Sequence, residues 1–96
     1  MYPKPETHAK VKARQLRTYA RDRQACVVAV WTRAQHRCEQ CHQWVLKPSE
    51  TDQPLSVGHV HEIIPRSRGG SATDPDNCRL LCVRHHAEAH HLRIGH

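Results

Sequence analysis

The sequence predicts a small α+β domain that is held together by a metal ion rather than by a large apolar core. The chain has 96 residues, which is enough for one domain with one core. Leu, Ile and Val make up only 17 of them and Phe is absent, a composition too poor in large apolar side chains to stabilise a fold of this size alone. Five cysteines and ten histidines supply metal ligands, and the odd number of cysteines disfavours a framework of disulfides.

The first third of the chain is expected to be helical. Two prolines within residues 2–6 predict an extended start. Residues 7–23 lack Gly and Pro and are rich in Ala, Lys, Arg and Gln, and a second helical run over about residues 25–35 places apolar side chains at helical spacing. We therefore divide the chain into a basic N-terminal arm or helix, residues 1–24, and a folded domain, residues 25–96.

Positive charge is concentrated in that arm. Residues 1–24 contain seven Lys or Arg against two acidic residues, so they carry +5 of the formal net charge of +6. Such a segment suits a polyanion such as DNA, with contacts expected from Lys10, Arg14, Arg17 and Arg21. A solvated helix face that only keeps the protein soluble explains this feature equally well.

Short strands and a closing helix are expected in the rest of the chain. A Cys-x2-Cys turn precedes a strand at about residues 44–46, and a second strand over residues 55–64 is rich in β-branched residues and ends at a proline. Residues 66–77 are predicted to form a long loop that contains glycine. Residues 78–94 are predicted to form a helix.

Two pairs of ligands predict a structural zinc ion. Cys38 and Cys41 form a Cys-x2-Cys pair, and Cys82 and His85 form a Cys-x2-His pair after 40 further residues. A single ion would then join a turn early in the domain to the start of its last helix, and its binding would stabilise the fold. Two alternatives stay open. In the first, His86 is also within reach of the ion. In the second, no metal binds, and the cysteines are reduced and buried as small apolar residues.

A second histidine pair lies in the closing helix. His86 and His90 are four residues apart and share one helical face, whereas His85 points about 100° away from His86. The spacing allows a second metal site, although exposed surface histidines give the same pattern.

Three segments, "CEQC", "HVHEIIPRSRGG" and "DPDNCRLLCVRHH", occur in an order that resembles the HNH endonucleases, the ββα-metal nucleases, in their zinc-binding form from phages and bacteria. The resemblance covers about residues 26–90. It implies two strands and a helix around one divalent ion, Mg²⁺ or Mn²⁺, beside the structural Zn²⁺. It also implies metal-dependent hydrolysis of phosphodiester bonds in DNA, by nicking or by double-strand cleavage.

The resemblance also implies roles for single residues. His61 and His86 correspond to metal ligands of the family, and His90 resembles an additional ligand. Asn77 corresponds to the asparagine that braces the loop. Independently of the resemblance, Arg66 and Arg68 stand on either side of Ser67, where they can bind phosphates beside the cleaved bond, although ordinary exposed loop charge gives the same pattern.

Glu62 departs from the family, because it stands where the histidine that deprotonates water is usual. A carboxylate, with a reference pKa of about 4.3, is a weaker base than imidazole, and neighbours in a strand point to opposite faces. Three alternatives follow: Glu62 is the base or binds the attacking water; or His59 or His61 is the base and Glu62 positions it; or the protein is an inactive zinc-stapled DNA-binding module. A zinc-ribbon adaptor for protein or RNA is a further class.

No apolar stretch of the sequence suits a signal peptide or a membrane span. We therefore expect a cytoplasmic protein that is bacterial or phage-encoded. Its expected partner is DNA and not a membrane, and a homodimer is a possible assembly.

Overall fold

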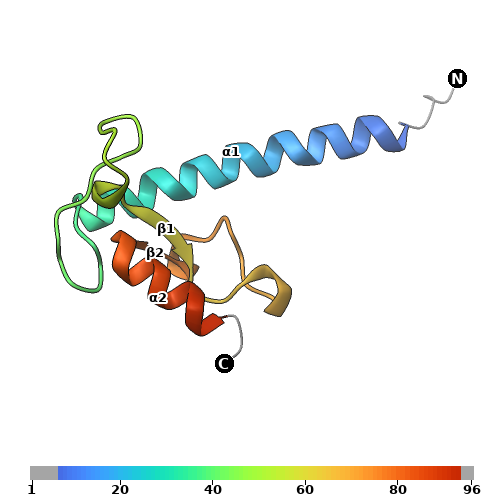
Figure 1. The fold of residues 1–96 in the computed structure, drawn as a ribbon. Coiled ribbons are helices and arrows are strands. Elements are labelled where there is room, and N and C mark those ends of the chain that lie inside the picture. The colour runs from blue at the N-terminus through green and yellow to red at the C-terminus, as the bar shows by residue number, and fades with distance from the viewer. Residues whose placement is uncertain (1–6, 94–96) are drawn as a thin grey trace, which may run out of the picture.

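A computed structural model describes residues 7–93, and for residues 91–93 it describes the backbone alone (Figure 1). The expected extended segment at residues 2–6 and the last residue of the expected closing helix lie outside the described residues. The elements are two α-helices, two strands and three short 3-10 helices. In chain order they are α1 (His8–Ala34), η1 (Pro54–Ser56), β1 (His59–Glu62), η2 (Arg66–Arg68), η3 (Pro75–Asn77), β2 (Cys78–Leu81) and α2 (Val83–Arg93). The predicted α+β class is confirmed, and the order β1–β2–α2 matches the expected ββα unit.

Helix α1 is one continuous helix, so the expectation of two separate helical runs was wrong. It begins at Thr7, whose hydroxyl accepts a hydrogen bond from the Lys10 N–H at 3.2 Å, and it ends where Gln35 takes the left-handed conformation with φ 53°. Residues 24 and 25, at the expected boundary of arm and domain, are Gln and Ala, both good helix formers, so nothing there interrupts the helix. In Figure 1 its N-terminal half projects beyond the rest of the molecule.

The two strands form an antiparallel pair whose register assigns each side chain to a face. His59 lies opposite Leu81 and His61 opposite Arg79, so the two histidines share a face of the sheet. The other face holds the alternate residues, Val60 opposite Leu80 and Glu62 opposite Cys78.

The two helices contact the sheet from different sides (Figure 1). The Sγ atom of Cys78 lies 3.7 Å from the Sγ atom of Cys26 in α1, which shows that the face with Cys78 packs on α1. The rings of His59 and His61 contact His86 of α2, so the face with the histidines packs on α2. The register thus separates the face that packs on α1 from the face that carries His59 and His61.

Three predicted elements differ from the structure. Residues 78–81 form β2 rather than the first turn of the closing helix, because this short apolar run pairs with β1, and periodicity alone does not tell a strand from a helix over four residues. Residues 44–46 make isolated bridges, Arg37 with Trp44 and Leu46 with Val57, rather than a strand. The strand expected over residues 55–64 is shortened to β1, since residues 54–56 form a 3-10 turn.

The core is small and rich in sulfur. Its buried members are Cys26, Val30, Trp31, Cys38, Val45, Cys78, Leu80, Leu81 and Cys82. Four of these nine are cysteines, whose side chains bury little apolar area, so burial alone gives this core limited stability. This agrees with the expectation that a metal ion supplies part of the stability.

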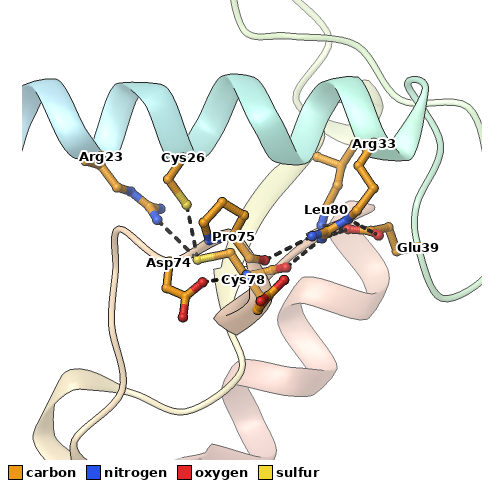
Figure 2. Close-up of polar contacts among 9 residues, drawn as sticks. Arg23, Cys26, Arg33, Glu39, Asp74, Pro75, Cys78 and Leu80 are labelled. Atoms are coloured by element: carbon orange, nitrogen blue, oxygen red, sulfur yellow. Dashed lines mark hydrogen bonds and ion pairs between the residues drawn. The ribbon is translucent and has the colours of Figure 1, made fainter.

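Two arginines attach α1 to the sheet (Figure 2). The Arg33 guanidinium donates to both carboxylate oxygens of Glu39, at 3.0 and 2.7 Å, and to the backbone carbonyls of Pro75 and Cys78, at 3.0 and 2.8 Å. Burial raises the pKa of Glu39, but the hydrogen bonds from Arg33 and from the Leu80 N–H outweigh it and hold that pKa below its usual value. Arg33 therefore links the end of α1 to both ends of the segment 75–78.

Arg23 makes the second attachment, ten residues earlier in α1. Its guanidinium donates to the Ala72 carbonyl at 2.7 Å and to the Val60 carbonyl at 3.5 Å, and it lies 3.6 Å from the Cys78 Sγ atom. Since Val60 stands between His59 and His61, Arg23 fixes the strand that carries both histidines. The C-terminal half of α1 is thus part of the folded domain.

Candidate metal centre and nuclease site

Four side chains predicted as zinc ligands meet at one point. The ligand atoms of Cys38, Cys41, Cys82 and His85 all lie within 4.8 Å of one another. Sγ of Cys38 and Nδ1 of His85 are 3.7 Å apart, Sγ of Cys82 and the same Nδ1 are 3.3 Å apart, and the sulfurs of Cys41 and Cys82 are 3.9 Å apart. Bonds of about 2.0 to 2.3 Å to a tetrahedral zinc require ligand separations of roughly 3.3 to 3.8 Å. The cluster can therefore hold a zinc ion with little rearrangement.

The local backbone prepares these ligands for a cation. The turn after Cys38 is closed by a hydrogen bond of 2.8 Å from the His42 N–H to the Cys38 carbonyl, with His42 at φ 65°. Burial opposes ionisation of Cys38, but backbone N–H groups of Cys41, Cys82 and Gln40 lower the pKa of its thiol to about 6. A thiolate is the form that binds zinc.

The second pair stands at the start of α2. Burial raises the pKa of the Cys82 thiol, and hydrogen bonds with the sulfurs of Cys41 and Cys38 raise it further. A bound cation would offset the charge of these crowded sulfurs. His85 is buried, and its outer nitrogen Nε2 lies 4.0 Å from the Glu88 carboxylate. The structure decides the open alternative in favour of His85, since His86 points to a different cluster.

That second cluster consists of imidazole rings from β1 and α2. The ring of His86 is stacked on that of His59, with centroids 4.6 Å apart and an interplanar angle of 8°, and it meets His61 edge-on at 5.5 Å and 79°. His90 lies one turn further along α2, and its ring centroid is 6.4 Å from that of His86. His61 is buried, whereas His90 is exposed. The predicted ligands His61 and His86 are thus brought together from residues far apart in the sequence.

The imidazole cluster is more open than the zinc cluster. Within residues 7–90, whose side chains are described, the cysteine cluster alone brings three or more ligand atoms within 4.8 Å of one another. His61, His86 and His90 therefore do not form a closed site of three ligands in this arrangement. An open arrangement leaves positions for water and substrate, as a catalytic ion needs.

Glu62 occupies the last position of β1, where it pairs with Cys78. This register places it in the row of Val60, on the face that packs on α1, while His59 and His61 are in the row that faces α2. The regular pairing of all four residues of β1 shows no bulge that would bring Glu62 to the histidine face.

Asn77 braces the loop that follows β1. Its side-chain Nδ2 donates to the carbonyls of Ile64 and Ser71, both at 2.9 Å, and its Oδ1 accepts from the Ile64 N–H at 3.0 Å. The Asn77 carbonyl also accepts from the Ile63 N–H at 2.7 Å. The amide thus ties both sides of the loop together, which is a positioning role.

The glycine pair allows the loop to close on this brace. Gly69 takes φ 88°, the left-handed region, and a Cβ atom on Gly70 would lie 1.7 Å from the Ile64 carbonyl oxygen and 2.9 Å from Nδ2 of Asn77. A backbone approach of this kind is open only to glycine.

Replacing Gly70 by alanine is therefore expected to lower the melting temperature by several degrees and to displace the Asn77 amide, because the added methyl group overlaps a backbone carbonyl. Gly69→Asn is the matched control. It also changes a loop glycine and strains the backbone at φ 88°, but nothing lies within 4 Å of the added Cβ and asparagine accepts positive φ more readily than most residues, so a smaller loss is expected. Equal melting temperatures for the two variants would contradict the close approach.

The predicted DNA-binding arginines of the loop lie on the surface. Arg66 and Arg68 form the 3-10 turn η2 and are exposed. The Arg66 guanidinium carbon lies 5.2 Å from the centre of the Tyr19 ring, a cation–π contact between this loop and α1. Lys10, Arg14, Arg17 and Arg21 are exposed along the projecting half of α1.

Residues 49–92 match the family model described as HNH endonuclease. This segment, a little under half of the chain, is therefore similar to the HNH endonucleases. The HNH match contains His59, His61, Asn77, His86 and the Cys82–His85 pair, and it begins after Cys38 and Cys41. A search of curated proteins and a search of solved structures found no match.

The match to the HNH model suggests a protein that cleaves or binds nucleic acid. Among the described helices, none combines the length and the apolar character that a membrane span requires.

The sequence analysis did not include His59 among the metal ligands, although its i, i+2 spacing from His61 places the two on one face. It missed Arg23, Arg33 and Glu39, whose partners are distant backbone groups that no local pattern reveals.

Proposed function

We propose that the protein is a metal-dependent DNA endonuclease whose active site is the imidazole cluster of β1 and α2. The observation that carries this proposal is the approach of His61 and His86, with ring centroids 5.5 Å apart, inside a segment that matches the HNH family. Two imidazoles from different elements on an open face can bind a divalent ion and still leave positions for a phosphate.

Each part of the site has a task in phosphodiester hydrolysis. A Mg²⁺ or Mn²⁺ ion held by His61 and His86, with His90 as a further ligand, would supply charge compensation for the phosphate and the departing 3′ oxygen. Asn77 keeps the loop in place, and Arg66 and Arg68 bind phosphates on either side of the cleaved bond. The Cys38, Cys41, Cys82 and His85 cluster holds a structural Zn²⁺ that fixes the start of α2.

The base that activates water is the part on which this chain departs from its family. The sheet register favours His59, because it shares a face with His61 and stacks on His86, whereas Glu62 is in the row that faces α1. A neutral imidazole is also the stronger base near neutral pH.

Supercoiled plasmid incubated with the purified protein and Mg²⁺ or Mn²⁺ is expected to become nicked or linear, and EDTA is expected to stop the reaction. His59→Ala is expected to reduce the rate by about a hundredfold or more, as loss of a general base does. Glu62→Gln, which keeps the size of the side chain, is expected to reduce it by less than about tenfold. The opposite ranking of the two variants would assign the base to Glu62.

The second candidate function is an inactive zinc-stapled DNA-binding module. It is favoured by Glu62, which stands where the family usually has the histidine that deprotonates water. This candidate predicts that plasmid stays supercoiled with either metal while the protein still binds DNA with an affinity that falls as salt is added. An adaptor for protein or RNA would also leave the plasmid supercoiled, but it would show no DNA binding that weakens with added salt.

A further inference from the structure

One face of α1 carries cations without acids. At about 100° per residue, Lys10, Arg14, Arg17 and Arg21 fall within about 60° of one another on the helical wheel and span roughly 16 Å along the axis. All four are exposed. Asp22 is the single acidic residue within His8–Ala34, and it falls outside this arc, although its carboxylate lies 3.7 Å from Arg21 Nε.

Of the basic stripe that these four residues form, Lys10, Arg17 and Arg21 face away from the folded domain, whereas Arg14 also lines a pocket with Thr73 of the loop. The residues of α1 that contact the sheet, Cys26 and Arg23, fall on the opposite side of the wheel. The histidines, in turn, lie on the face of the sheet that packs on α2, while α1 covers the other face. A phosphate backbone that follows the stripe is therefore distinct from the stretch of DNA that reaches His61.

The same face of α1 continues into a groove of about 530 Å³ beside the end of the helix. Its apolar wall is formed by Val27, Val28, Trp31 and Pro48, and Val28 is 54% exposed. Lys47 also lines the groove, with its ammonium nitrogen 5.8 Å from the centre of the Trp31 ring. By helical periodicity, Val28 lies in line with Lys10 and Arg21.

We propose that the stripe and the groove together bind a single-stranded segment of DNA, a proposal that rests on the proposed nuclease function. The stripe follows the phosphates, and the groove receives an unstacked base against Val28, with Lys47 neutralising the adjoining phosphate. A cationic track beside an exposed apolar wall suits a single strand, because the cations follow its phosphates and the wall accepts an unstacked base. A duplex keeps its base faces stacked and offers nothing to the apolar wall, so complementarity of charge and surface favours an unpaired strand.

The test measures binding of a fluorescein-labelled 15-nucleotide oligo(dT) by anisotropy, with plasmid nicking in parallel. Val28→Asp is expected to weaken binding of the oligonucleotide by about tenfold or more, because it removes the apolar contact and repels the phosphate. Leu16→Asp is the matched control: the same charge change on an equally exposed aliphatic residue of α1, outside the arc of the stripe. It is expected to change binding by less than about threefold. The control Leu16→Asp is expected to nick plasmid at the wild-type rate.

A second pair of variants keeps the test independent of the apolar contact. Lys47→Glu is expected to weaken oligonucleotide binding about as much as Val28→Asp, whereas Lys12→Glu, a change of equal charge off the stripe, is expected to have a small effect. Equal losses within either pair would overturn the proposal, as would a wild-type protein that nicks plasmid but does not bind oligo(dT). A wild-type protein that binds oligo(dT) through Val28 and Lys47 but never nicks plasmid would refute the nuclease function and leave this surface standing.

Discussion

Replacing His61 by alanine is expected to abolish metal-dependent cleavage of plasmid while largely preserving affinity for DNA. His61 is the buried member of the imidazole cluster and meets His86 from the neighbouring element, so its loss leaves the catalytic ion with one ligand of that pair. The charge compensation that such an ion provides contributes several kcal/mol to the transition state, so the expected reduction is about a thousandfold or more. Initial rates of plasmid nicking at saturating Mn²⁺ measure it.

The control for this variant is His8→Ala, which removes an exposed histidine of α1 far along the chain from the cluster. It is expected to cleave at the wild-type rate. DNA affinity of both variants, measured without divalent metal, should stay within about threefold of the wild-type value, since phosphate contacts come from other residues. A His61→Ala protein that cleaves normally would remove His61 from the metal site.

Replacing Cys38 by serine is expected to release the structural zinc and unfold the domain at room temperature. The four ligands lie at separations that suit tetrahedral zinc, and the free energy of binding such an ion is on the order of 10 kcal/mol, as large as the whole stability of a small domain. Zinc content by mass spectrometry and thermal melting followed by circular dichroism measure the effect.

Cys26→Ser is the matched control, because it makes the same chemical change at a buried cysteine outside the zinc cluster. Its sulfur contacts Cys78 at 3.7 Å, so the variant is expected to lose about 1 to 3 kcal/mol and still retain a full equivalent of zinc. A Cys38→Ser protein with an unchanged melting curve would contradict the role of the ion.

The parts of this molecule that could be predicted from sequence are those set by local spacing. The Cys-x2-Cys and Cys-x2-His pairs specify their own geometry, so the ligand cluster was predicted residue by residue. The α+β class and the succession of a strand and a helix around the histidines were likewise predicted. His85 was named as the fourth ligand with His86 as an alternative, and the start of α2 after the strand at residues 78–81 places the His85 ring beside the three cysteines.

The parts that could not be predicted depend on contacts between distant residues. Arg33 stands six residues from Glu39, but it also binds carbonyls of Pro75 and Cys78, which only the tertiary fold brings near. The position of Glu62 relative to His61 is set by pairing with β2, a strand that periodicity alone assigned to a helix. An exposed helix without Gly or Pro gives no sign of where its contacts with the domain begin.

The continuity of α1 fixes the phase between its two halves. Arg23 and Arg33 clamp the C-terminal half, and a rigid screw of 1.5 Å and about 100° per residue transmits that orientation to Lys10 and Arg14. One residue inserted after Asp22 would rotate the projecting half by about 100° without altering its composition or net charge. The number of residues in α1 thus sets the angle between the two DNA segments of the proposal, the one along the basic stripe and the one at the histidines.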